Sequence, residues 1–266
     1  MKISIFGTMN DPLRSSSGPG YFSSISRKNQ AENLSRILPP VKSTENWQLN
    51  SCEFPTRVFV INLDRRIDRW DEFKLRNSLL FENFEVSRFP AIEKEDRQSA
   101  IFESHFSCLQ ENFKNSDSII VMEDDAYLAE GWLPKLKLAF QDLPKDWDCL
   151  IGNHYFFGQM QILTPHLAQP LGIASTINFV VYRKTILEKI SSNWDQRKET
   201  PDFDHFITSE KVPIQNYTIW PMISREYLSF SDHKQRIRNM EIRVAENSHL
   251  FQFVDSDTYY PSIPNW

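Results

Sequence analysis

Three consecutive carboxylates, Glu123, Asp124 and Asp125, follow the apolar residues 119–122. A short apolar run bounded by polar residues is typical of a buried strand, so the acids stand at the carboxyl end of a predicted strand. Ligands of open α/β sheets bind beyond that edge. A hard divalent ion, Mg²⁺ or Mn²⁺, satisfies adjacent carboxylates and bridges two phosphates. The alternative is a solvated turn in which one of the two aspartates caps the following segment.

A second acidic strand end lies earlier in the chain. Residues 57–63 form an almost unbroken apolar run that predicts another buried strand, with Asn62 at its end and Asp64 directly after it. Arg65 and Arg69 follow, and arginine is suited to binding phosphate. These four residues are therefore candidates for contact with a nucleotide. A solvated, charged helix start is the alternative.

The elements around these residues alternate between strands and helices. Apolar residues at helical spacing predict helices near residues 67–80, 97–115 and 132–143. Further strands are predicted at residues 84–89 and 148–153, and apolar strands that alternate with helices favour an α/β fold with a mostly parallel central sheet. We assign this domain to residues 57–266.

Residues 1–56 differ from the rest because Ser, Pro, Asn and Gly are frequent there. They predict an N-terminal extension that packs on the domain or lies at its periphery, with a short strand at residues 2–6 and a short helix at residues 27–37. A partly disordered tail is the alternative.

The composition narrows the class of protein. The formal net charge is −5 and the pI is about 5.7, so nucleic acid is a poor candidate partner. No apolar run is long enough to span a bilayer, and the first residues do not form a signal peptide. The three cysteines lie far apart without CxxC spacing, so neither a disulfide framework nor a zinc site is indicated. We expect a soluble, cytoplasmic protein.

Several stretches resemble glycosyltransferase family 25, which includes bacterial lipooligosaccharide galactosyltransferases and collagen galactosyltransferases. VFVINLDRRIDRW resembles the family's opening strand and loop, and ESHFSCLQENFKNSDSIIVMEDDAYL resembles its Ser-His helix and acidic, DxD-like motif. INFVVYRKTILEKI, PDFDHFI and WPMISREYLSFSDH resemble later segments. Together they cover residues 57–233 in the family's order.

The chain departs from the family's pattern in places. Ala100 and Ile101 stand where the family often has Gly-Cys, and Ser-Thr-Ile-Asn at residues 175–178 replaces Gly-Thr-His-Ala. Residues 1–56 have no counterpart. These departures bear on which sugar is used more than on the fold.

The resemblance implies a GT-A fold and an inverting, metal-dependent transfer of a hexose such as galactose. The donor would be a nucleotide diphosphate sugar, with UDP as the expected nucleotide, and the acceptor a hydroxyl of a glycan, a lipid-linked glycan or a protein. Asp125 would bind Mn²⁺ or Mg²⁺ directly, with Glu123 outside it and Asp124 near the ribose. Ser104 would line the sugar or nucleotide pocket. Asp232 and His233 would give the metal another ligand, although a plain loop is an alternative there.

Two further acids are candidates for the general base. Asp202 and Asp204 alternate around Phe203, so in an extended segment they would point the same way. The resemblance favours Asp204 as the base that removes the acceptor's proton; a helix cap or an ion pair is the alternative. His105 lies on the apolar face of its predicted helix, which favours a core histidine over a catalytic one.

Two other classes of protein remain open. A nucleotidyltransferase also uses acids at strand ends, metal and phosphates, but it usually carries a Gly-rich loop after its first strand. This chain has INLDRR there and only 7 Gly in all. The other class is a catalytically silent relative that binds glycan, against which the intact acidic triplet argues.

Overall fold

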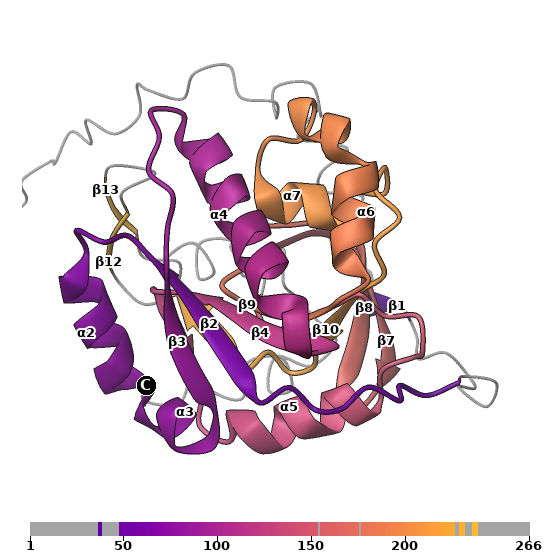
Figure 1. Cartoon of the computed structure of the whole chain (residues 1–266). Coiled ribbons are helices and arrows are strands. Elements are labelled where there is room, and N and C mark those ends of the chain that lie inside the picture. Colours follow the sequence, from indigo (N-terminus) through magenta and orange to yellow (C-terminus); the bar gives the residue numbers. More distant parts are fainter. Residues whose placement is uncertain are drawn as a thin grey trace, which may run out of the picture.

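The computed structural model describes residues 37–38, 48–153, 155–175, 177–226, 229–231 and 236–238. Within these ranges one large sheet has nine strands (Figure 1). In order across the sheet they are β1 (Ile37–Leu38), β7 (Tyr155–Thr164), β8 (Leu167–Ser175), β10 (Asn216–Ile219), β6 (Cys149–Ile151), β9 (Phe179–Arg183), β4 (Ser118–Glu123), β2 (Arg57–Asn62) and β3 (Glu85–Pro90).

Most strands of this sheet run in the same direction. The pairs β3–β2, β2–β4, β6–β10 and β1–β7 are parallel, and only β8 and β9 of the nine described strands run opposite to the other seven. The predicted α/β fold with a mostly parallel central sheet is therefore confirmed. The carboxyl ends of β2, β4, β6 and β10 consequently lie at one edge of the sheet.

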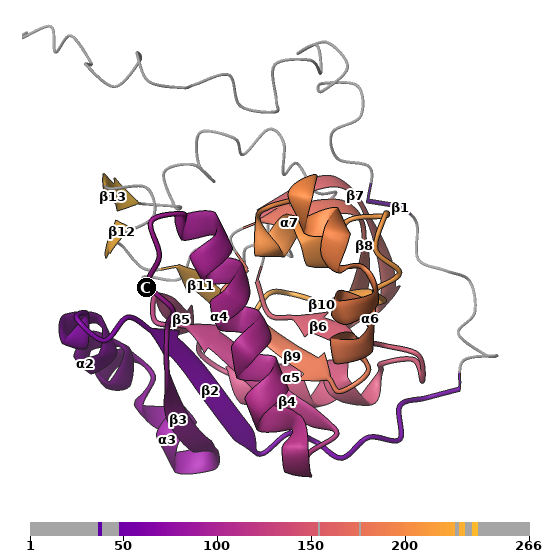
Figure 2. The same ribbon diagram turned by 45° about the horizontal axis from the view of Figure 1, so that its top comes forward.

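Helices cover both faces of the sheet. One face carries α4 (Arg97–Asn112), α6 (Ile186–Ser192) and α7 (Phe203–Thr208), and the other carries α2 (Ile67–Arg76), α3 (Ser78–Asn83) and α5 (Trp132–Gln141). Figure 2 shows α4, α6 and α7 on the same side. Short 3₁₀ helices, η2 (Phe113–Asn115) and η3 (Trp194–Lys198), extend α4 and follow α6.

Alternation along the strands produces two separate cores. On β4, Ile119 and Val121 pack with α4 and α6, whereas Ile120 and Met122 pack with α2 and α5. Successive side chains of a strand point to opposite faces, so a strand covered on both sides has to be apolar throughout. This requirement explains why the continuous apolar runs of the sequence predicted β2 and β4.

The helix predicted over residues 67–80 is divided at Asn77. Its buried side chain donates to the carbonyl of Ala126 (2.9 Å) and accepts from the N–H of Leu128 (3.0 Å). Asn side chains that bond to backbone groups compete with helix formation. Asn77 thereby fixes β5 (Ala126–Leu128), which pairs with β11 (Ser224–Glu226).

The described part of the N-terminal extension contacts the domain. Ile37, the last residue of the predicted helix at 27–37, lies instead in β1, where it completes a parallel pair with Met160 of β7. Phe54 packs edge-on against Phe140 of α5 at 5.3 Å between ring centroids. The predicted strand at residues 2–6 and the rest of the predicted helix lie outside the described residues, so the role of residues 1–56 stays a prediction.

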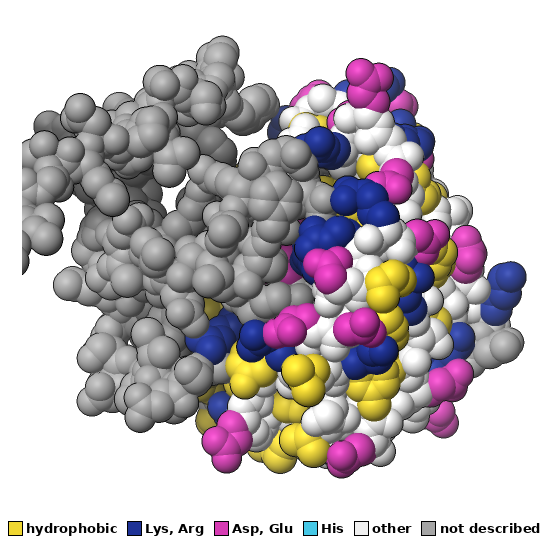
Figure 3. All heavy atoms as spheres, turned by 90° about the vertical axis from the view of Figure 1, so that its left-hand side faces the viewer, with side chains coloured by type: hydrophobic (Ala, Val, Ile, Leu, Met, Phe, Trp, Pro, Cys, Tyr) yellow, Lys and Arg dark blue, Asp and Glu magenta, His cyan; other side chains and the backbone are white. Residues whose placement is uncertain are grey.

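The surface in Figure 3 mixes charges of both signs. Over its described part, basic and acidic side chains are interspersed, with hydrophobic side chains gathered toward the bottom of the view. The described chain also includes β12 (Ser229–Ser231) and β13 (Arg236–Arg238), which pair with each other. None of the helices within the described ranges has both the length and the apolar character of a membrane span.

We expect Gly152→Ala to lower the free energy of unfolding by about 1–3 kcal/mol, the usual cost of overpacking a core. A Cβ at Gly152, directly after β6, would lie 2.5 Å from Cδ1 of the buried Phe179 ring. Backbone hydrogen bonds from Gly152 N to Phe179 O (2.8 Å) and from Ile223 N to Gly152 O (2.9 Å) prevent the chain from moving aside. Urea denaturation measures the change.

The control is the same substitution in a Phe179→Leu background, where the ring is absent. There, Gly152→Ala should cost clearly less, because residues in contact couple in a double-mutant cycle. Equal costs in both backgrounds would contradict the clash.

Candidate functional site

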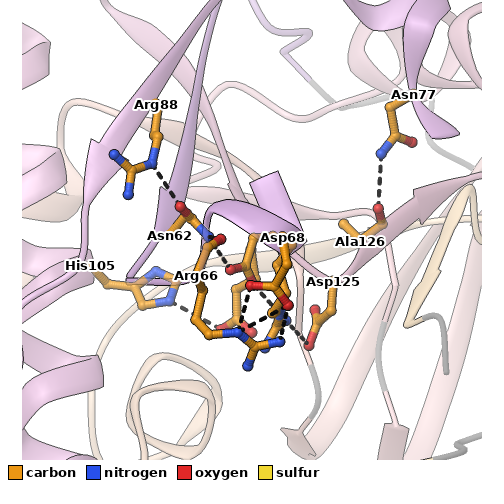
Figure 4. Close-up of polar contacts among 11 residues, drawn as sticks. Asn62, Arg66, Asp68, Asn77, Arg88, His105, Asp125 and Ala126 are labelled. Carbon is orange, nitrogen blue, oxygen red and sulfur yellow. Dashed lines mark hydrogen bonds and ion pairs between the residues drawn. The ribbon is translucent and has the colours of Figure 1, made fainter. Parts of the chain in front are cut away.

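The acidic turn, defined here as Glu123, Asp124 and Asp125, lies where β4 ends. β2 and β4 are parallel neighbours with Ile61 opposite Glu123, so Asn62 comes to lie beside Asp124. Asn62, which is labelled in Figure 4 beside Arg88, donates from its Nδ2 to Asp124 Oδ2 at 2.6 Å across 62 residues of sequence. The carboxyl ends of β2 and β4 therefore meet at one point of the sheet's edge.

Arg69 of α2 binds two carboxylates of the acidic turn. Its Nη2 forms an ion pair with Asp124 Oδ1 and another with Asp125 Oδ2, the latter at 3.0 Å. All three side chains are largely buried, with exposed fractions of 10–12%. One guanidinium nitrogen thus lies between both aspartates.

Burial raises the pKa of Asp124 to about 7. The Arg69 guanidinium and the Asn62 hydrogen bond lower this pKa, while the charges of Asp125 and Glu123 raise it further. Removing a carboxylate from water disfavours its charged form, and like charges nearby add to that effect. A cation at this turn therefore favours the ionised form of Asp124.

Asn62 connects the acidic turn to the loop after β2. It is buried, and its Nδ2 also donates to the carbonyl of Arg66 (3.0 Å), while its Oδ1 accepts from Arg88 Nε (2.6 Å). Arg88 in turn forms an ion pair with the exposed Asp64 at 2.9 Å. These contacts orient Asn62 toward Asp124, and the Asn62 side chain in turn positions the Asp124 carboxylate.

For two other predicted site residues, Arg65 and Ser104, the contacts described below are with residues outside the acidic turn. Arg65 forms an exposed ion pair with Glu93 at 2.7 Å. Ser104 is buried; its hydroxyl donates to Ala100 O (2.7 Å) and accepts from Ile92 N (2.8 Å). Ser104 thus connects the loop after β3 to α4, and both of its hydrogen bonds are made within the protein.

His105 lies in the core with one edge at the acidic turn. It is 5% exposed, its ring stacks on Phe203 at 4.4 Å between centroids, and its Nε2 lies 3.3 Å from Glu123 Oε1. Its Nδ1 is buried without a hydrogen-bond partner among the described residues. The apolar helix face correctly predicted a buried histidine; its contact with Glu123 is a feature of the tertiary structure.

The prediction of an extended segment around Phe203 is wrong. Phe203–Thr208 is helix α7, and Asp202 stands at its N-cap position. Since successive helical residues turn by about 100°, residues two apart point to different sides. Asp202 accepts from Gln98 Nε2 (3.0 Å), whereas Asp204 Oδ2 accepts from the N–H of Ile177 (3.1 Å).

A buried amide network beside the acidic turn was not predicted. The N–H of Asn178 donates to Asn153 Oδ1 (2.9 Å), and Ser224 Oγ donates to Asn178 Oδ1 (2.7 Å). The carbonyl of Asn178 accepts from the N–H of Glu123 at 3.0 Å. In the sequence, Asn178 stands directly before the apolar run of β9, and this position was the signal that could have indicated a buried polar residue at the end of a strand. Because Asp204 binds Ile177, the network connects Asp204 to Glu123 through adjacent residues.

The donor chemistry of the acidic turn fits Mg²⁺ or Mn²⁺. These ions prefer carboxylate oxygens, keep several waters, and are often bound by one or two carboxylates together with substrate phosphates. Asp125 would hold the ion directly, with Glu123 outside it. The described residues contain no group of three or more His, Cys, Asp or Glu gathered around a common point. Asp232 and His233 lie outside the described residues.

Comparisons with known proteins give only distant similarities. No protein-family model matches the chain, and no curated protein matches it. It is similar to the crystal structure of a glycosyltransferase involved in the glycosylation of the major capsid of PBCV-1, with 12% identity, a TM-score of 0.47, and coverage of 75% of this chain and 100% of the other.

It is also similar to a mutant Drosophila beta-1,4-galactosyltransferase 7 in complex with manganese, UDP-Gal and xylobiose. There the identity is 9% and the TM-score 0.32, with 71% of this chain and 74% of the other covered. The resemblance to glycosyltransferase family 25 thus rests on the ordered sequence motifs and stays a prediction.

Proposed function

We propose that this chain is a GT-A glycosyltransferase that moves a hexose from a nucleotide diphosphate to a hydroxyl acceptor. The observation that carries the proposal is the acidic turn held at the carboxyl edge of the sheet by Asn62 and Arg69. In open α/β sheets this edge is where nucleotides bind. The ordered motifs favour UDP-galactose or a similar UDP-hexose as donor and inversion as outcome. The acceptor is a glycan, a lipid-linked glycan or a protein, and the setting is glycan synthesis such as lipopolysaccharide assembly in the cytoplasm.

The residues at this edge have complementary tasks. Arg69 offers a guanidinium to the diphosphate, and the resemblance assigns Asp124 to the ribose. Asn62 keeps Asp124 oriented through its contacts with Arg88 and the Arg66 carbonyl. A divalent ion held by Asp125 neutralises the leaving diphosphate when bound.

Asp204 is the proposed base for the acceptor hydroxyl. Its bond to the N–H of Ile177 places it next to Asn178, whose carbonyl binds the Glu123 N–H. Asp202 instead contacts Gln98 and lies 3.6 Å from His205 Nδ1. The short path from Asp204 to the acidic turn supports Asp204 over Asp202.

Incubation with a panel of nucleotide sugars tests the proposal. We expect one UDP-hexose to release UDP, faster with Mn²⁺ than with EDTA, and to label a glycan acceptor. Release of pyrophosphate in the presence of a sugar phosphate and a nucleoside triphosphate would identify a nucleotidyltransferase instead. Glycan binding without release of any nucleotide would identify a silent relative.

A further inference from the structure

We infer that Arg69 is an internal cation that occupies the acidic turn in the nucleotide-free protein and competes there with a divalent ion. The competition concerns Asp124 and Asp125 alone. A second step rests on the proposed function: when a nucleotide diphosphate binds, Arg69 transfers to its phosphates and leaves Asp125 to the metal and Asp124 to the ribose.

The geometry of the ion pairs supports this competition. A single nitrogen, Nη2 of Arg69, contacts Oδ1 of Asp124 and Oδ2 of Asp125. It therefore lies where a cation that bridges both carboxylates would lie. Asn62 holds the second oxygen of Asp124 at 2.6 Å, so this carboxylate is oriented toward Arg69.

Burial makes the competition strong. The three side chains are nearly shielded from water, and attraction between shielded charges is much less screened than attraction between exposed ones. By contrast, the exposed ion pair of Arg65 and Glu93 contributes little stabilising free energy. An incoming divalent ion has to displace Arg69 or share the carboxylates with it, and both lower its affinity.

A diphosphate would remove this obstacle. Arginine binds phosphate through paired, charge-assisted hydrogen bonds, so the diphosphate offers Arg69 an alternative anion. The nucleotide would then increase the affinity for the metal, and by linkage the metal would increase the affinity for the nucleotide by the same factor. This ordering would keep the acidic turn free of metal until a donor is present.

The test measures Mn²⁺ binding to the full chain without nucleotide, by the electron paramagnetic resonance signal of free Mn²⁺. Arg69→Met should bind Mn²⁺ on the order of tenfold more tightly than wild type, within the usual range of coupling between sites. Arg66→Met is the charge-matched control: Arg66 lies one helical turn away and pairs with Asp68 at 2.8 Å. It should change the affinity by less than about twofold, the result expected for loss of one positive charge without loss of the bridge. Equal or weaker binding by Arg69→Met, including no binding by either protein, would overturn the inference.

Arg69→Lys covers the case in which Arg69→Met does not fold. Lysine keeps the charge but is a more compact donor without the planar fork, so an intermediate gain in affinity is expected. An affinity equal to that of wild type would overturn the inference in this variant as well. In folded Arg69→Met, UDP should increase Mn²⁺ affinity by a smaller factor than in wild type, because only the bridge through the diphosphate then contributes.

The two proposals fail in different ways. If no nucleotide binds to wild type while Arg69→Met still binds Mn²⁺ more tightly, the proposed function fails and the competition stands. If UDP binds but the variants bind Mn²⁺ like wild type, the competition fails and the proposed function stands.

Discussion

Asp204→Asn should lower the rate of sugar transfer by about 10²–10⁴-fold, the contribution of a positioned general base. Asparagine keeps an oxygen that can accept the N–H of Ile177, the hydrogen bond that Asp204 makes at 3.1 Å. The substitution therefore removes the basic carboxylate and leaves the local support in place. Affinity for UDP should barely change, because the residue would act on the acceptor and not on the diphosphate. Steady-state release of UDP and calorimetry with UDP measure the two quantities.

Asp202→Asn is the matched control on the same loop. Asp202 contacts Gln98 and His205 at the surface, so its substitution should leave transfer near the wild-type rate. If Asp202→Asn is the inactive variant, the two roles are exchanged. If both variants remain active, the base lies elsewhere. Weaker Mn²⁺-dependent UDP binding in Asp204→Asn would place Asp204 in the donor site.

The second large effect is expected for Asp125→Asn, which should abolish the gain in UDP affinity that Mn²⁺ provides to wild type. An amide is a much poorer ligand for a hard divalent ion than a carboxylate, so the ion would no longer join the protein to the diphosphate. Calorimetry with Mn²⁺ and with EDTA measures this gain. The circular dichroism spectrum should be unchanged, because the substitution preserves the shape of the side chain.

Glu123→Gln is the comparison variant for Asp125→Asn, because Glu123 is the carboxylate proposed to lie outside the direct metal ligand. Glu123 contacts His105, so its substitution should reduce the metal-linked gain only in part. Equal UDP affinity of wild type with Mn²⁺ and with EDTA would refute the metal bridge. Unfolding of Asp125→Asn would indicate that the carboxylate supports the turn through its ion pair with Arg69.

The sequence by itself determined those elements of this fold whose burial constrains local composition. β2 and β4 are covered by helices on both faces, so they appear in the sequence as unbroken apolar runs. The acidic turn was visible for the same reason, since three carboxylates have to stand outside such a strand. Local patterns also predicted α4 and α5, whose apolar residues recur at helical spacing.

Helix α7 shows where a local pattern was misread. Asp202 and Asp204 suggested an alternating, extended segment, but Phe203, Phe206 and Ile207 recur at helical spacing and are buried against α4. The free energy of burying three apolar side chains decides the conformation, and two polar residues do not oppose it. The spacing of the apolar residues was the better signal.

Only the tertiary structure decided which charges meet. Asn62 and Asp124 are 62 residues apart, and they touch because β2 and β4 pair in a parallel register that places Ile61 opposite Glu123. The sequence contained Arg69 as one of several arginines after β2, yet it could not indicate that this side chain closes on Asp124 and Asp125. Patterns in a sequence report which side chains are buried, because burial depends on composition nearby. Contacts between polar groups depend on strand register and helix placement, which arise from the packing of the whole chain.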